Sequence, residues 1–110
     1  LRLWAEVLSR PEPGLAIAGM GLRDVAMDQG LPRPLALYRN GVRLAGLDSA
    51  EVFRLNDQHA FIALAEGSDV SVGDVIEFGI SHPCTTFDRW PVLYLVDPSL
   101  RITGAIRTWF

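Results

Sequence analysis

The sequence predicts one mostly β domain, an antiparallel sandwich or barrel-like fold with one or two short helical turns. Gly- and Pro-containing turn signals recur at intervals of roughly 8 to 12 residues, as they do in small all-β domains. The apolar stretches between them are short, and few keep a 3.6-residue period for three turns. The chain has 110 residues, 49% of them hydrophobic and 21% charged, which suits one hydrophobic core.

The first part of the chain is divided by its turn residues. Residues 1–9 are apolar and strand-like, and the Pro- and Gly-containing segment 10–14 closes them. Residues 15–20 form a short apolar run that indicates a buried strand. Residues 22–29 are predicted to form one or two helical turns, which end at Gly30.

The strongest local signal is Asn40-Gly41, which lies between the apolar segments 35–39 and 42–46. Asn and Gly accept the positive φ angles of a type I′ turn, so this pair predicts a β-hairpin. Segment 81–90 (SHPCTTFDRW) is polar and is predicted to be irregular. The remaining strands are expected at 51–56, 59–65, 75–80, 91–96 and 100–110. Six aromatic residues within these strand patterns are expected in the core: Trp4, Tyr38, Phe53, Phe61, Phe78 and Tyr94.

The charged residues exclude several functions. All 10 basic residues are Arg, so this chain cannot supply a lysine Schiff base or a P-loop lysine. The net charge of −3 argues against binding to nucleic acid or to an acidic membrane surface. One cysteine, Cys84, excludes an internal disulfide and favours a reducing compartment, so we expect a cytoplasmic protein.

Both ends of the sequence favour a piece of a longer protein. The chain begins inside an apolar pattern at Leu1 and ends on Trp109-Phe110. Its mean hydropathy of +0.21 is high for a small domain, which indicates apolar surface meant for another domain or a partner. Gly19-Met20-Gly21 begins like a dinucleotide-binding fingerprint, but the third glycine is missing and nucleotide binding is rejected.

His82-Pro83-Cys84 is the segment most suggestive of chemistry. Imidazole and thiolate are common zinc ligands, and Pro83 restricts the backbone between them. A closed zinc site needs four ligands, and nothing in the sequence brings His59 or Asp88 close enough to complete one. Two other interpretations stay open: a hydrogen-bonded loop histidine beside a buried, inert cysteine, and a Cys–His nucleophilic pair in which His82 or His59 is the base.

The stretch from Ser81 to Trp90 also resembles a known family. It is similar to the C-terminal domain of the D-serine dehydratase-like enzymes of pyridoxal-phosphate (PLP) fold type III. That group includes D-serine dehydratases, bacterial D-threonine dehydratases or amino acid deaminases, and D-threonine aldolases, with the deaminase branch most similar. Supporting segments are 19–21 with 23–25, 55–61 and 105–110.

The resemblance implies a parent enzyme with two domains. An alanine-racemase-like (β/α)8 barrel, absent here, would hold PLP on a lysine, and residues 1–110 would close the active site within a homodimer. The matching His82 and Cys84 would bind zinc, with water and substrate completing the shell. Gln58 and His59 match a family motif and would line the pocket or support the metal, and Asp57 would orient His59.

The sequence is therefore compatible with three functions. The first is dehydration of a D-hydroxy-amino acid, D-threonine or D-serine, to a 2-oxo acid and ammonia, with zinc polarising the β-hydroxyl. The second is retro-aldol cleavage, as in the aldolase branch, where His-x-Asp is usual and suits harder metals. The third is a non-catalytic β module for dimerisation or partner binding. Without a lysine, the 110 residues alone are expected to be inactive.

Overall fold

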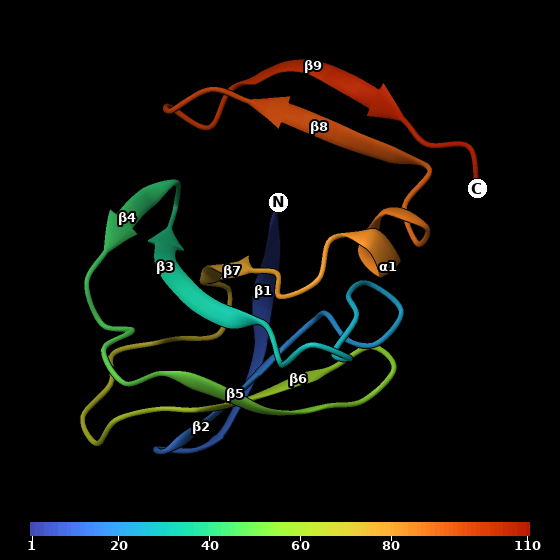
Figure 1. The fold of residues 1–110 in the computed structure, drawn as a ribbon. Coiled ribbons are helices and arrows are strands. Elements are labelled where there is room, and N and C mark those ends of the chain that lie inside the picture. Colours follow the sequence, from blue (N-terminus) through green and yellow to red (C-terminus); the bar gives the residue numbers. More distant parts are fainter.

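The computed structural model describes all of residues 1–110, and its regular structure is mostly antiparallel β, as predicted (Figure 1). Seven strands form one sheet in the order β4-β3-β7-β1-β2-β6-β5, and two form a separate hairpin, β8-β9. The helical content is one short turn, α1. The elements are β1 (Arg2–Glu12), β2 (Leu15–Ala18), β3 (Arg33–Arg39), β4 (Val42–Leu44), β5 (Glu51–Leu55), β6 (Ala60–Ala63), β7 (Val75–Gly79), α1 (Cys84–Phe87), β8 (Val92–Val96) and β9 (Ile102–Arg107).

Strand β1 organises the sheet because its two halves pair with different neighbours. Its first half, Arg2–Glu6, pairs with β7, and its second half, from Val7 onward, pairs with β2. Register shifts after Val7 and after Ser9 bend the strand where it changes partner. The sheet curls far enough for β3 and β5 to come into contact, which gives it a barrel-like form.

One local prediction is confirmed and two are corrected. Asn40 and Gly41 have φ angles of 51° and 76° and connect β3 to β4 in the expected hairpin. Residues 22–29 form hydrogen-bonded turns, including Val25 N–H to Gly21 C=O at 3.1 Å, and no helix. The helical turn lies instead at α1, inside the segment predicted to be irregular.

The core is filled mainly by small and branched side chains, because the curled sheet leaves little depth inside. Phe78 is fully buried, as expected for a core aromatic, and Met20 packs in the same cluster. The expectation of a core position was wrong for Trp4, Phe53 and Tyr94, which are 36%, 53% and 66% exposed. Strand β1 presents Ala5 and Val7 to the interior instead, and β5 presents Val52 and Leu55, whereas β8 buries no residue fully. The core cluster consists of Ala5, Val7, Ala16, Ala18, Met20, Val25, Leu37, Val52, Leu55, Ala60, Ile62, Leu64, Val70, Ile76 and Phe78.

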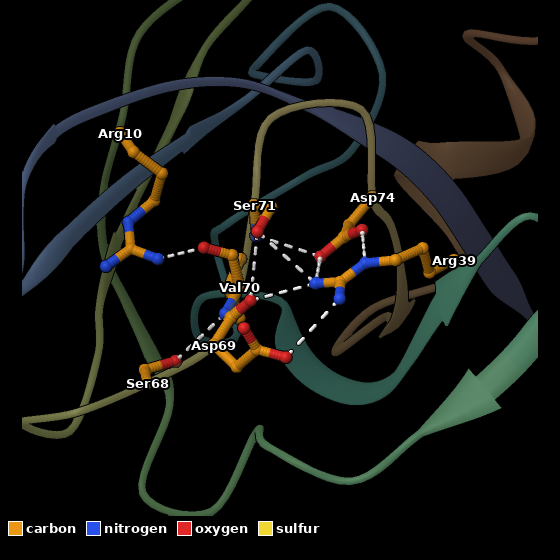
Figure 2. A network of polar contacts seen from close by, with 7 residues as sticks. All are labelled: Arg10, Arg39, Ser68, Asp69, Val70, Ser71 and Asp74. Atoms are coloured by element: carbon orange, nitrogen blue, oxygen red, sulfur yellow. Dashed lines mark hydrogen bonds and ion pairs between the residues drawn. The ribbon is translucent and has the colours of Figure 1, made fainter.

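The loop between β6 and β7 is fixed by a polar network around a buried carboxylate (Figure 2). Asp74, only 2% exposed, accepts hydrogen bonds from Arg39 Nε at 2.8 Å and Nη2 at 2.9 Å, and from the Ser71 N–H at 2.8 Å. Arg10 reaches across to the carbonyl of Val70. The hydrogen bonds from Arg39 hold the pKa of Asp74 below its ordinary value, against the opposing effect of burial.

The hairpin β8-β9 pairs with no strand of the main sheet and lies apart from it at the top of Figure 1. A cavity of about 720 Å³ separates the two, and it is lined by apolar residues of β1 and of the hairpin, such as Trp4 and Ile102. No helix in the structure is long and apolar enough to cross a membrane.

Candidate functional site

The segment that carries His82 and Cys84 is held in place by its own backbone. Pro83 caps α1, and its carbonyl accepts hydrogen bonds from the N–H groups of Thr86 at 3.0 Å and Phe87 at 2.9 Å. Thr86 is buried, and its hydroxyl donates to the carbonyl of His82 at 3.1 Å. These bonds fold the polar sequence into one helical turn, with His82 just before it and Cys84 as its first residue.

The long loop between β2 and β3 lies directly beneath α1 (Figure 1). Two side chains that follow α1 hold the two segments together. Arg89 Nε donates to the carbonyl of Leu22 at 3.0 Å, and Trp90 Nε1 donates to the carbonyl of Asp24 at 2.8 Å. Ser81, which precedes the turn, donates to the carbonyl of Gly30 at 2.6 Å. Both ends of the His82–Cys84 segment are therefore bonded to the same loop.

The other side of this loop rests on the turn between β5 and β6. The N–H of Leu22 donates to the carbonyl of Asn56 at 2.9 Å, and the N–H of Arg23 donates to that of Asp57 at 3.0 Å. Gly21 permits the close approach, since a β-carbon there would lie 2.6 Å from the Asp57 carbonyl. The loop thus links the two sequence segments that were singled out, 55–59 and 81–90.

One short polar contact in the site joins two side chains 54 positions apart. His82 Nδ1 lies 2.6 Å from Asp28 Oδ2, and the Thr85 hydroxyl lies 3.4 Å from Asp28 Oδ1. A carboxylate only accepts hydrogen bonds, so Nδ1 carries the proton and, in the neutral ring, Nε2 carries the lone pair. The hydrogen bond from His82 lowers the pKa of Asp28 below its ordinary value.

Cys84 and His82 present different donor atoms on the same short segment. The thiol of Cys84 is free and exposed, so the interpretation of a buried cysteine is wrong, and the His82 side chain is 30% exposed. No group of three or more His, Cys, Asp or Glu side chains in the chain is arranged to hold a metal ion. Neither His59 nor Asp88 therefore completes such a group with this pair. A metal bound here would take its remaining ligands from outside the chain.

Three other predicted site residues lie together on the β5–β6 turn. Asp57, Gln58 and His59 are exposed and line a hollow of about 510 Å³ with Leu22. The hollow is on the turn that supports the loop, and the roles of these side chains in lining the substrate pocket stay predictions.

Sequence reasoning missed Asp28. It lies in the segment that was interpreted as helical, and no local pattern distinguishes it from the other exposed acidic residues. Only a fold that brings the β2–β3 loop beneath α1 reveals its contact with His82. Asp28 and His82 are 54 positions apart, and no sequence motif links residues at that distance.

The fold and the site together define the class of this domain: it is an antiparallel β domain with a His-x-Cys segment, in which the cysteine is exposed and the partly buried histidine is hydrogen-bonded to a carboxylate. The chain belongs to the family described as "Putative serine dehydratase domain", which matches residues 1–96. The expected family is thereby confirmed.

A solved structure, a D-threonine aldolase from Filomicrobium marinum, shares the fold. It has a TM-score of 0.72 and 24% sequence identity, and the match covers 94% of this chain and 26% of that one. The chain therefore spans about a quarter of the length of that protein. No curated protein matches the sequence closely enough to count as a relative.

Proposed function

We propose that residues 1–110 are the C-terminal domain of a PLP-dependent lyase that acts on D-hydroxy-amino acids. Membership of the serine dehydratase family supports the assignment to PLP-dependent lyases. The D-threonine aldolase that shares the fold is about four times as long, which supports a parent protein with a second, larger domain. PLP would be held by a lysine of that second domain, because this chain contains none. We expect the parent to be a cytoplasmic homodimer.

The observation that carries the proposal is that His82 and Cys84 each present a free donor atom. The contact with Asp28 leaves Nε2 of His82 as the free donor, and an exposed thiol follows two residues later. Nitrogen and sulfur donors of this kind suit zinc. Zinc held by the two residues would act as a Lewis acid on the β-hydroxyl of the substrate. Two protein ligands leave positions for water and substrate, as in catalytic sites.

Within this scheme the chain has two tasks. The α1 segment holds the imidazole and the thiol at fixed positions, since both of its ends are bonded to the β2–β3 loop. The thiolate favours zinc, and so we propose dehydration to a 2-oxo acid and ammonia as the reaction. The D-threonine aldolase with the same fold makes retro-aldol cleavage the second candidate.

The products distinguish these reactions. The natural-length protein is given D-threonine with PLP and zinc. Dehydration yields 2-oxobutanoate and ammonia, whereas retro-aldol cleavage yields glycine and acetaldehyde. We expect the first pair, and we expect His82→Ala and Cys84→Ala to lose turnover. Full activity of both variants would refute the roles assigned to these residues.

A non-catalytic module is the third candidate, and the exposed apolar hairpin β8-β9 favours it. In that case His82 and Cys84 would be structural, and neither zinc content nor any D-amino-acid turnover would depend on them. Turnover of a D-amino acid by the 110 residues alone would contradict all three candidates, because the chain supplies no lysine.

A further inference from the structure

Of the hydrogen bonds that join segment 81–90 to the β2–β3 loop, only the contact between His82 and Asp28 involves a predicted metal ligand. The distance of 2.6 Å is that of a strong, charge-assisted hydrogen bond. The His82 and Asp28 side chains are 30% and 46% exposed, so packing covers only part of the imidazole. The hydrogen bond from Nδ1 to Asp28 is the directional contact that selects the orientation of the ring.

Asp28 is itself held on both sides. Its second oxygen lies 3.4 Å from the hydroxyl of Thr85, which belongs to α1. Its backbone follows the segment tied down through Arg89 to Leu22 and through Trp90 to Asp24. The carboxylate therefore approaches His82 from a fixed direction, and it can set both the tautomer and the angle of the ring.

We propose that Asp28 is a positioning residue for His82, which fixes the Nδ1–H tautomer and aims Nε2 outward as a metal ligand. The proposal rests on the metal-binding role proposed above for His82 and Cys84. A carboxylate behind a ligating histidine also increases the basicity of the donor nitrogen. Asp28 thus contributes to metal affinity without touching the metal.

The tautomer is tested first, in the absence of metal. The chain has only two histidines, so labelling histidine with ¹⁵N gives two ring signals, and His59 serves as the internal reference. Spectra are recorded well above the ordinary imidazole pKa of about 6.5. We expect His82 to be in the Nδ1–H form, and Asp28→Ala to return it to the Nε2–H form preferred in water. An unchanged His82 signal in Asp28→Ala would overturn the proposal.

Zinc affinity is the second readout, measured on the natural-length protein by competition with a chromogenic chelator. Loss of a carboxylate behind a ligating histidine weakens binding by roughly 10- to 100-fold, and we expect this for Asp28→Ala. Asp28→Asn keeps the size of the side chain and should fall between, since its amide oxygen still accepts a hydrogen bond. Glu66→Gln removes an exposed carboxylate from the β6–β7 loop and should bind like the wild type.

The outcomes separate the two proposals. Equal zinc affinity in Asp28→Ala and wild type would overturn the positioning role and leave the metal site standing. Failure of the wild type to bind zinc would overturn the metal site and the positioning role together. Circular dichroism of each variant checks that the fold is kept, and Asp28→Asn, which fills the same space, repeats the test if Asp28→Ala unfolds.

Discussion

Gly21 lies where the β2–β3 loop touches the β5–β6 turn, and the space there admits no side chain. A β-carbon at this position would lie 2.6 Å from the carbonyl of Asp57 and closer still to that of Asn56. Backbone atoms cannot turn away as the end of a flexible side chain can. The loop that carries Asp28 therefore keeps its position because residue 21 has no side chain.

Gly21→Ala is expected to destabilise the domain by about 1–3 kcal/mol, the range for steric overpacking. Gly14→Ala is the matched control, since its β-carbon would lie 3.9 Å from the nearest atom, the carbonyl oxygen of Leu64. Urea unfolding of the two variants measures the difference. Equal stability of both would mean that the contact between Gly21 and Asp57 is not as tight as described.

Asp74 makes stability depend on pH through its pairing with Arg39. Its pKa is lowered in the folded state, so its contribution is complete above the ordinary aspartate pKa of about 3.9 and is lost as the pH falls through the lower folded value. Asp74→Asn should cost about 1–3 kcal/mol at neutral pH, because Arg39 loses a buried partner but is itself partly exposed.

Thermal unfolding between neutral pH and about pH 3 tests this linkage. The melting temperature of the wild type should fall more steeply on acidification than that of Asp74→Asn, so the two curves should converge at low pH. Asp28 and Asp97, whose pKa values are also lowered, contribute equally to both proteins. Parallel curves across the whole range would contradict the role given to Asp74.

At the scale of elements, the hairpin β3-β4 is determined locally by its two turn residues. Asn40 and Gly41 adopt the left-handed conformation that most L-residues avoid. Their backbone twist matches that of the paired strands, so the turn sets the register Arg39–Val42, Tyr38–Arg43 and Leu37–Leu44.

Gly41→Ala is expected to cost about 1–2 kcal/mol, because alanine at a φ of 76° is strained. Gly41→Asn should cost less, since asparagine tolerates this conformation. Chemical denaturation of the pair provides the comparison. A Gly41→Ala variant as stable as the wild type would show that the turn changes type at little cost.

How well each element could be predicted depends on how far apart in the sequence the contacting residues are. The Asn40-Gly41 hairpin was predicted because its signal is local. Strand β1 extends three residues beyond its predicted end, since Pro11 is accommodated near a register shift. Helix α1 was missed because four residues carry no helical period. The contact between Asp28 and His82 was missed because it depends on the arrangement of the whole chain.

At the scale of the molecule, the main feature is the unequal distribution of exposed apolar surface. The hairpin β8-β9 exposes Tyr94 by 66% and Ile102 by 64%, and it borders the apolar cavity against β1. Contiguous apolar surface of this kind marks an interaction site. A larger domain packed on this surface, as in the proposed parent, would remove it from water.

The 110-residue chain by itself is therefore expected to associate as its concentration rises. Tyr94→Arg combined with Ile102→Arg should reduce this association, since it places charge on the hairpin. Val72→Arg is the control, because Val72 is 60% exposed in the β6–β7 loop and does not line the cavity beside the hairpin. Sedimentation velocity measures all three. If the double substitution leaves the association unchanged, the surface through which the chains associate does not include the hairpin.

The zinc content of the purified natural-length protein tests the central claim most directly. Elemental analysis of the wild type should find about one zinc ion per chain, as for a single catalytic site. His82→Ala and Cys84→Ser should each lose most of it, whereas Glu66→Gln should retain it. A wild type without zinc, or variants that keep the full amount, would contradict the account.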